Sequence, residues 1–332
     1  MGARRTVTVR DVADIAGVSP STVSRVLNGG GKVSDPLRAR VTAVADSLGY
    51  VRSVAAQALR GRRTAVFVLV SDPRSFPIAT QAAAIEQAAK AEGVLASIVV
   101  VGPDTYSRGA ATIRTLRSLR PRAIIVSYPE PNVADVAPEL NRFIAEGGRV
   151  VTIGEPGIGF PTVEHDDTGN VRMMGHYLAS LGRRRPAIVT DQGALRHRLE
   201  VMLETLAGHG FDPAAIPVEA VALTAQAARE AALRLVGRAE PPDLIYATND
   251  VLALAVLDGL LAAGVRVPDE VMVAGHDNIP LAGDATPGLT TIALDFAAAG
   301  RAALEMSLAS DQVATVLPGQ LIVRQSTALV GA

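Results

Sequence analysis

Apolar residues recur at helical spacing over the first fifty or so positions, in three groups separated by polar or glycine-containing stretches. Gly17 interrupts the first group and can adopt the left-handed backbone conformation that a sharp turn between helices requires. Ser19 and Pro20 are the residue types of an N-cap and a first helical position, and Ser34 or Asp35 can cap a third helix that Gly49 ends. We therefore predict a compact helix-turn-helix domain. Its inward-facing residues would be Val12, Ile15, Ala16, Val23, Val26, Leu27, Val41, Val44 and Leu48.

From Thr64 onward the pattern changes to short apolar strands that alternate with helices. Such alternation predicts parallel sheets with helices on both faces, and the rhythm restarts near residue 175, which indicates two doubly wound lobes. A crevice would then lie at the carboxyl ends of the strands. The expected strands are 65–70, 97–102, 123–128, 149–154, 186–190, 243–250 and 270–278, and helices are expected around 85–89, 175–182 and 196–209.

The charge of the chain is unevenly distributed. The net charge is −1, but residues 1–63 contain eleven lysines and arginines against four aspartates, so this end carries +7 and the remainder −8. A basic end on an acidic body fits phosphate contact at one end only. The chain has no cysteine, which excludes disulfides and thiolate chemistry, and we see neither a signal sequence nor a membrane span. We expect a cytoplasmic protein without membrane contact.

The polar face of the second predicted helix carries Ser21, Thr22, Arg25 and Asn28, with no acid among them. Short polar side chains with one arginine suit a helix that lies in the major groove of DNA. The alternative is a pair of core helices whose polar face is simply solvated. The basic end and the third helix favour the DNA-binding interpretation.

Three segments of this end, RDVADIAGVSPSTVSRVLN, KVSDPLRARV and LGYVRSVAAQALRGRRT, resemble the headpiece of the LacI/GalR family of transcription repressors. The resemblance continues through HDDTGNVRMMGHYLASLGRRRPAIV, YATNDVLALAVLDGL and GVRVPDEVMVAGHDN. It implies a two-lobed core similar to periplasmic sugar-binding proteins, between whose lobes the chain crosses three times. The implied divisions are a headpiece over 1–52, a hinge over 53–63 and a core over 64–332, with lobes at about 64–162 plus 294–322 and about 163–293 plus 323–332.

The family resemblance also implies how the protein would bind DNA. A dimer would bind an inverted repeat, and its hinges would become helical in the minor groove, where Leu59 would wedge between base steps and Arg60 would lie near the backbone. From the residues alone, 53–63 is a flexible linker, because so short a helix is not stable in water. We assign DNA contacts to Thr8, Ser19, Ser21, Thr22, Arg25, Asn28, Ser34, Leu59 and Arg60. The dimer surface would include the region of Gln81–Lys90.

Candidate effector contacts follow predicted strand ends. Arg198 occupies the arginine position that contacts the effector in the family, and Asn249 and Asp277 follow two strands. Together with Phe76 they suit ligand hydroxyls or a small anion. Each polar residue has an alternative role: a surface charge for Arg198, a helix cap for Asn249 and a turn for Asp277. A sugar is the expected effector, although the chain has no tryptophan and few aromatic residues for stacking on a sugar ring.

Enzymatic interpretations find little support. The five histidines are scattered without metal-ligand spacing, there is no G-x-S-x-G or Walker sequence, and Asp166–Asp167 precede a helix at a lobe junction. We expect no enzyme activity, metal or cofactor. The predicted function is a repressor of a metabolic operon whose operator affinity a small effector changes. The alternative is a small-molecule sensor with a non-functional headpiece.

Overall fold

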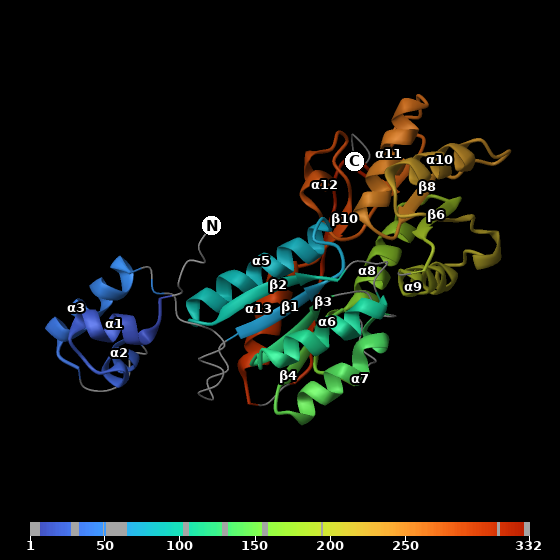
Figure 1. Ribbon diagram of the computed structural model, residues 1–332. Helices are drawn as coiled ribbons and strands as arrows, with labels where there is room; N and C mark the ends of the chain where they lie inside the picture. Colours follow the sequence, from blue (N-terminus) through green and yellow to red (C-terminus); the bar gives the residue numbers. More distant parts are fainter. Residues whose placement is uncertain are drawn as a thin grey trace, which may run out of the picture. The chain divides into compact units, whose positions relative to one another are not determined.

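The computed structural model describes residues 7–27, 33–48, 50, 65–101, 106–127, 132–154, 159–193, 195–310 and 313–328. The chain divides into two units, Met1–Thr64 and Ala65–Ala332, which are described separately below (Figure 1). Among the described residues, no helix is both long enough and apolar enough to cross a bilayer.

The first unit contains the predicted helix-turn-helix. Its helices are α1 (Val9–Ala16), α2 (Pro20–Leu27) and α3 (Asp35–Ser47), and Gly17 ends α1 with a φ of 65°. Ile15, which the pattern predicted to face inward, is 62% exposed. The buried stripe of α1 runs through the 12, 13 and 16 positions instead, and Ile15 lies on the flank of that stripe. The buried core consists of Val12, Ala13, Ala16, Val23, Val26, Val41 and Ala45.

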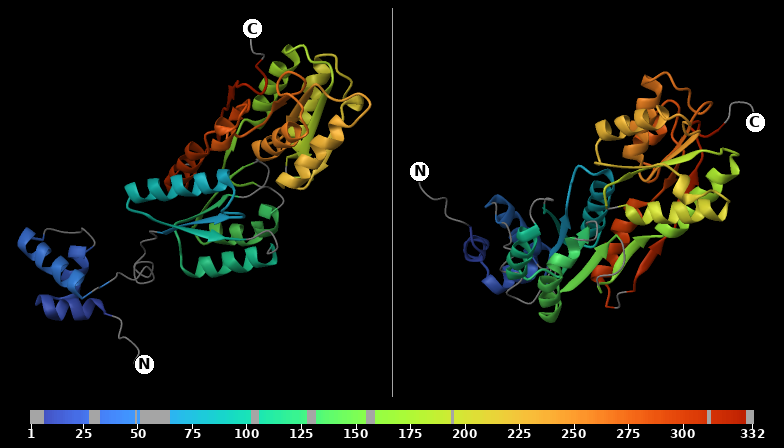
Figure 2. Two further views of the ribbon diagram at one scale, coloured as in Figure 1. Left: turned by 90° about the horizontal axis from the view of Figure 1, so that it is seen from above. Right: turned by 90° about the vertical axis from the view of Figure 1, so that its right-hand side faces the viewer.

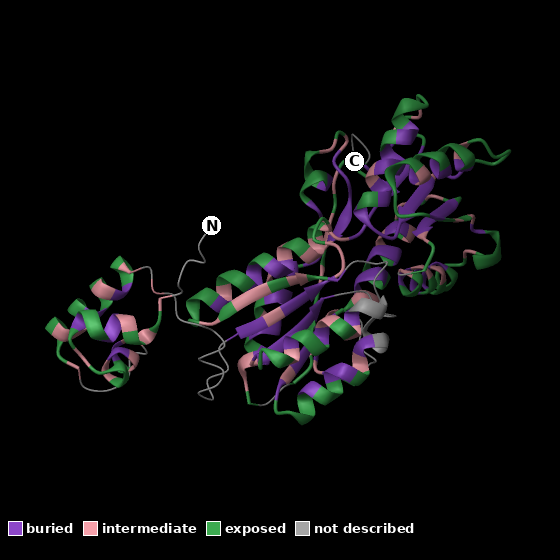
Figure 3. Ribbon diagram, viewed as in Figure 1, coloured by how far each residue is buried: buried purple, intermediate pink, exposed green. Residues whose placement is uncertain are grey.

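The first lobe of the second unit is built on a six-stranded sheet of order β11-β5-β4-β3-β1-β2, in which every strand pair is parallel. Helices α5 and α13 cover one face and α6 and α7 the other, so the central strands are buried, whereas the edge strand β2 is partly exposed (Figure 3). The strands are β1 (Ala65–Val70), β2 (Leu95–Val100), β3 (Ala123–Ser127), β4 (Arg149–Ile153), β5 (Thr162–His165) and β11 (Thr315–Leu317). The helices are α5 (Phe76–Ala91), α6 (Tyr106–Ser118), α7 (Asn132–Ala145) and α13 (Phe296–Leu308).

The second lobe is built on a four-stranded parallel sheet of order β7-β6-β8-β9. Helices α8 and α9 pack on one face and α10 and α11 on the other. The strands are β6 (Pro186–Asp191), β7 (Val218–Val221), β8 (Leu244–Ala247) and β9 (Met272–Ala274). The helices are α8 (Asp167–Ser180), α9 (Arg196–Gly208), the short 3-10 helix η2 (Pro213–Ala215), α10 (Ala225–Val236), α11 (Asp250–Ala262) and α12 (Pro280–Asp284). This architecture confirms the predicted fold class, with doubly wound sheets in both lobes.

The chain passes between the two sheets at three points: from β5 into α8, from β10 (Thr291–Ala293) into α13, and from β11 into β12 (Gln320–Ile322). Strands β10 and β12 pair with each other in an antiparallel ribbon. After the second crossing, α13 lies beside α5 in the first lobe (Figures 1 and 2). The contact is close, because a Cβ atom on Gly300 would lie 2.5 Å from the Gln81 carbonyl oxygen.

Candidate functional sites

The exposed face of α2 carries the residues predicted to read DNA. Val23 and Val26 are buried on the opposite face, while Ser21 and Arg25 are exposed and Thr22 is half-buried. The Ser19 hydroxyl lies 2.8 Å from that of Ser21 and 2.9 Å from that of Thr22, and it accepts the Thr22 backbone N–H at 3.2 Å. Since no acidic side chain pairs with Arg25 among the described residues, its guanidinium is available to an external acceptor.

Two other predicted DNA contacts have structural positions at helix starts. Thr8 is the N-cap of α1: its hydroxyl donates to Asp11 Oδ2 at 2.7 Å, and the Asp11 backbone N–H donates back to it. Ser34 is the N-cap residue of α3, but its hydroxyl makes no capping hydrogen bond. Both side chains are exposed. Asn28, Leu59, Arg60 and the predicted hinge lie outside the residues that the structure describes.

Arg198 is the centre of a buried polar cluster at the carboxyl edge of the second sheet. It lies in the first turn of α9 and is only 7% exposed. Its Nε and Nη2 donate to Asp167 at 3.0 and 3.1 Å, and its Nη1 donates to Asp277 Oδ1 and to the Thr248 carbonyl oxygen, both at 2.9 Å. The structure therefore brings together two predicted residues, Arg198 and Asp277.

The loop after β9 carries Asp277 in a strained conformation. Asp277 and Asn278 have φ values of 111° and 52°, which are costly for residues with side chains. Hydrogen bonds hold the loop on the second crossing: the Asp277 N–H donates to the Ile292 carbonyl at 2.9 Å, and the Asn278 N–H donates to Thr291 Oγ1 at 3.3 Å. The Arg324 guanidinium, just after β12, also donates to Asn278 Oδ1 at 2.8 Å. The candidate effector loop is thus bonded to two of the three crossings.

Asp250, the first residue of α11, also holds this loop through hydrogen bonds. Its Oδ2 accepts the Ile279 backbone N–H at 2.9 Å, and its Oδ1 accepts the Thr291 hydroxyl at 2.6 Å. Burial raises the pKa of Asp250 to about 8, with a further contribution from the negative charge of Asp277. Asn249, the neighbouring residue, caps α11 by accepting the Leu252 N–H at 2.9 Å, which is the structural role that the sequence left open for it.

Burial and the positive charge of Arg198 determine the pKa values of the neighbouring carboxylates and histidines. Burial raises the pKa of Asp277 to about 6 against the opposing effect of Arg198. Burial would also raise the pKa of Asp167, but the positive charge of Arg198 and its hydrogen bonds to this carboxylate hold that pKa below its usual value. Burial lowers the pKa of His165 and, further, that of His276, so both imidazoles are neutral near pH 7.

Two histidines and two phenylalanines lie next to the Arg198 cluster and to one another. His276 is fully buried, and its Nε2 lies 3.8 Å from Asp167 Oδ1 without a hydrogen-bond partner among the described residues. Both ring nitrogens of His165, at the end of β5, are likewise buried and unpartnered. His165 packs edge-on against Phe296 at 5.4 Å, and Phe296 packs edge-on against Phe76 at 6.4 Å. Phe76, Phe296 and His165 therefore form one aromatic group, whereas the other described phenylalanines and tyrosines lie elsewhere in the chain.

Sequence reasoning missed Asp167, His165, His276 and Phe296 as members of this site. Asp167 was considered only as half of a carboxylate pair, and the histidines only as metal ligands. Among the described residues, no group of three or more potential ligands could hold a metal ion. Their positions in the chain were a better signal: His165 is the last residue of β5, and His276 and Asp277 lie two and three positions after the end of β9.

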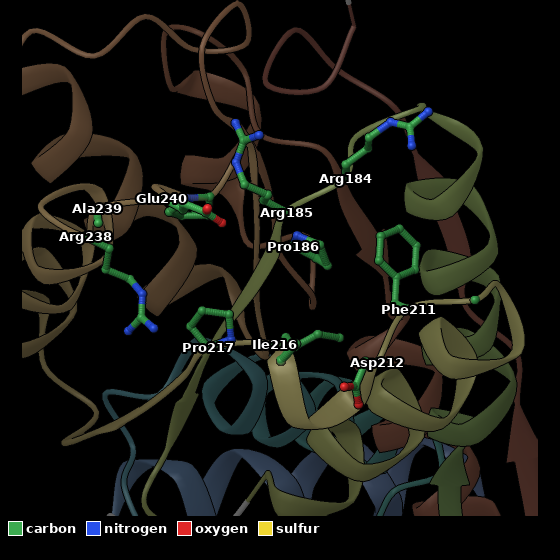
Figure 4. Close-up of a pocket in the computed structure, with 13 residues that line it drawn as sticks. Arg184, Arg185, Pro186, Phe211, Asp212, Ile216, Pro217, Arg238, Ala239 and Glu240 are labelled. Carbon is green, nitrogen blue, oxygen red and sulfur yellow. The ribbon is translucent and has the colours of Figure 1, made fainter.

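A separate cavity of about 790 Å³ lies at the opposite, amino-terminal end of the second sheet. None of the predicted effector residues lines it. Its three arginines point in different directions and share the lining with two carboxylates, so the cavity does not converge on one ligand (Figure 4). Its labelled lining residues include Arg184, Arg185, Phe211, Asp212, Arg238 and Glu240.

Comparison with known proteins places these sites in context. Residues 8–53 match the family model for bacterial regulatory proteins of the lacI family, and residues 176–327 match a periplasmic binding protein-like domain. The chain is 30% identical to the HTH-type transcriptional regulator DegA of Bacillus subtilis, over 96% of this chain and 98% of that protein.

Solved structures show the same fold. A Lac repressor dimer bound to operator and the anti-inducer ONPF superposes with a TM-score of 0.86 at 23% identity, covering 98% of this chain and all of that one. The complex of the transcriptional regulator CelR with cellobiose gives a TM-score of 0.69 at 26% identity, covering 96% of this chain and 99% of that one.

Proposed function

The chain belongs to the lacI family of bacterial regulatory proteins, and on this premise we propose that it represses a metabolic operon as a homodimer on an inverted-repeat operator, under the control of a polyhydroxylated effector. As a member of this family it is a DNA-binding transcriptional regulator. Because it acts on the chromosome, we place it in the cytoplasm.

The DNA-binding half of this proposal is supported by an exposed arginine on a folded helix, which has no ion-pair partner within the described part of the headpiece. Arg25 lies one turn after Ser21 on the exposed side of α2. A bidentate arginine contact with guanine discriminates between bases by about 1–3 kcal/mol. One headpiece is therefore too weak to select a single operator, and two headpieces on a two-fold site are needed. The intact headpiece core argues against the alternative of a sensor with a non-functional headpiece.

The dimer surface is expected on the exposed side of α5. The sequence predicts that Gln81 belongs to this surface. Its side chain is instead only 6% exposed, and it accepts a hydrogen bond from the Ser127 hydroxyl inside the first lobe. Its side chain faces the core because α13 packs closely against this part of α5. The residues of α5 that remain exposed in this region are Ala83, Glu86, Gln87 and Lys90.

The effector would bind at the Arg198 cluster, with Asp277 as a hydrogen-bond acceptor and Phe76 as part of the opposite wall. Phe76 is 37% exposed at the start of α5, where the first strand of the sheet ends. Apolar ring edges and charged hydrogen-bonding groups on opposing walls suit a sugar. The CelR relative binds a disaccharide in its complex, which supports this class of ligand.

The proposed switch follows from the loop that carries Asp277. Because this loop is hydrogen-bonded to the second and third crossings, a ligand that changes the loop also changes how the lobes are joined. The ligand can act only through its different affinity for the two lobe arrangements. Typical allosteric coupling of about 1–3 kcal/mol corresponds to a change in DNA affinity of roughly 5–150-fold.

The DNA half is tested by selecting duplexes from a random library with the full-length protein at fixed salt. We expect an inverted repeat to be enriched, and the Arg25→Ala variant to lose preference at one base in each half-site. Enrichment of no repeat, with or without cell-extract metabolites, would overturn the proposal.

The effector half is tested by operator release with a panel of uncharged sugars. We expect Arg198→Met to abolish the response to the active sugar while operator binding without sugar persists. Arg196→Met is the matched control, because Arg196 lies on the same helix but is exposed and paired with Glu200. Equal responses of the two variants would place the effector elsewhere.

A further inference from the structure

We propose that Asp167 determines the charge specificity of the effector site, so that the site accepts an uncharged polyol and rejects anions such as sugar phosphates and sugar acids. This inference rests on the proposed effector role of the Arg198 cluster and names the class of ligand that the cluster takes. It narrows the sequence-based expectation, which allowed either hydroxyls or a small anion.

Most hydrogen-bond donors of the Arg198 guanidinium are already used within the protein. A guanidinium has five N–H donors. Asp167 takes two of them in a bidentate pair, and Asp277 and the Thr248 carbonyl take two more from Nη1. The described part of the chain offers no partner to the fifth N–H, on Nη2, so one donor remains for a ligand. An anionic group needs at least two convergent donors to replace its hydration, and Arg198 cannot supply them without losing a partner inside the protein.

The group formed by Arg198, Asp167 and Asp277 carries a net negative charge. Arg198 contributes one positive charge, whereas Asp167 and Asp277 contribute two negative charges within hydrogen-bonding distance of it. His165 and His276 are neutral and add none. An anion beside Arg198 would therefore meet two carboxylates and one guanidinium that are all largely buried, and like-charge repulsion between buried groups is only weakly screened.

Asp167 lies at the amino-terminal end of a helix. It is the first residue of α8, after the N-cap Asp166, whose Oδ1 accepts the Gly169 N–H at 2.9 Å. The positive end of the helix dipole and the bidentate arginine both stabilise the charged carboxylate there. The negative charge beside Arg198 is thus built into the start of a helix, and it does not depend on the ligand.

The remaining groups complement hydroxyls. Asp167 and Asp277 retain free lone pairs that accept O–H donors, and the partnerless imidazole nitrogens of His165 and His276 can each donate or accept. A sugar hydroxyl both donates and accepts, so it can satisfy carboxylate and imidazole together. The charged oxygens of a carboxylate or phosphate group only accept, so such a group placed beside the two aspartates would give them no donor.

The test uses inorganic phosphate and gluconate as anionic probes on the full-length protein, with binding measured by calorimetry. We expect no saturable binding to the wild-type crevice. We expect Asp167→Asn, which frees Arg198, to bind the probes saturably, with a Kd at least about tenfold below the highest probe concentration at which wild type shows no binding. Asp269→Asn is the control, because it removes the same charge from an exposed position paired with Arg266. Asp277→Asn, which removes the other negative charge, replaces Asp167→Asn if that variant does not fold.

Saturable anion binding by wild type, or no gain in the Asp167→Asn variant, would overturn the inference. A gain that the Asp269→Asn control shares would also overturn it. Operator selection by the same preparations separates this result from failure of the proposed function. A protein that selects an inverted repeat but is released by an anionic sugar refutes only the role of Asp167.

Discussion

Replacing Thr291 by valine tests whether the effector loop depends on its hydrogen bonds to the second crossing. Thr291 is fully buried, and its hydroxyl donates to Asp250 Oδ1 at 2.6 Å and accepts the Asn278 N–H at 3.3 Å. Valine has nearly the same shape, so the substitution leaves no cavity. It removes the hydroxyl and leaves a buried N–H and a buried carboxyl oxygen facing a methyl group.

The expected loss follows from those two groups. A buried polar group that loses its partner costs about 1–3 kcal/mol. The short bond to Asp250 belongs at the upper end of that range and the longer bond from Asn278 at the lower end, so the total is about 2–4 kcal/mol. Thr291→Ser keeps the hydroxyl and loses one methyl group, which costs about 1 kcal/mol. The difference between the two variants therefore isolates the hydrogen bonds.

Scanning calorimetry is the suitable assay, because the chain has no tryptophan to report on unfolding. At about 2–4 °C per kcal/mol, Thr291→Val should lower the Tm of the core by roughly 4–16 °C and Thr291→Ser by roughly 2–4 °C. The valine variant should also weaken effector binding, since the loop that carries Asp277 loses a support. A valine variant as stable as the serine variant would show that this hydroxyl does not hold the loop.

Three further predictions follow. Arg25→Ala should weaken discrimination at one base pair of each half-site by about 1–3 kcal/mol, measured by gel shift at fixed salt. An unchanged base preference would show that Arg25 of α2 does not contact bases in the major groove. Because the pKa of Asp250 is raised from 3.8 to about 8, its contribution to stability is present below pH 4 and is lost as the pH rises through 8. The Tm of Asp250→Asn relative to wild type should therefore increase between pH 5 and pH 8, and parallel curves would contradict the burial argument. Gly300→Ala should destabilise the first lobe by about 1–3 kcal/mol in a thermal melt, because the new Cβ meets the Gln81 carbonyl at 2.5 Å. Gly208→Ala, in a helix and with open space around its Cβ, should not destabilise, and equal Tm values for the two variants would refute the close packing of α5 and α13.

Elements with strong local chemistry were predicted well. Gly17 and Pro20 mark the end of α1 and the start of α2 as expected, because left-handed backbone and a missing N–H are properties of single residues. The continuous apolar run of β1 was also placed correctly. The segment 243–250 was only half right: its strand ends at Ala247, and Asn249 begins a helix by capping it.

Elements whose identity depends on their neighbours were missed. β5 (Thr162–His165) contains polar residues and becomes a strand because it lies between β4 and β11 in the sheet. β11 itself follows α13 by a short connection and has only three residues. Neither has a hydrophobic period long enough to be recognised from sequence, since pairing partners remote in the chain define them.

The candidate site was predicted only in part, because its contacts join residues that are far apart in the sequence. Arg198 and Asp277 were named from their positions relative to predicted elements, and the structure joins them by a 2.9 Å hydrogen bond across 79 positions of sequence. Asp167, 31 positions from Arg198, was not assigned to the site, because sequence does not show which carboxylate a buried arginine will select. Its contribution to the charge of the crevice became visible only from the geometry.

The buried side chains of the headpiece have a consequence for gene control at different temperatures. All seven fully buried apolar residues described in that unit are valines or alanines, which bury far less surface than leucine or phenylalanine would. So small a core gives a marginal domain, whereas the body has four extensive clusters. Warming alone would therefore lift repression while the body still recognises its metabolite, so the upper temperature limit of regulation is set by the headpiece and not by the sensor.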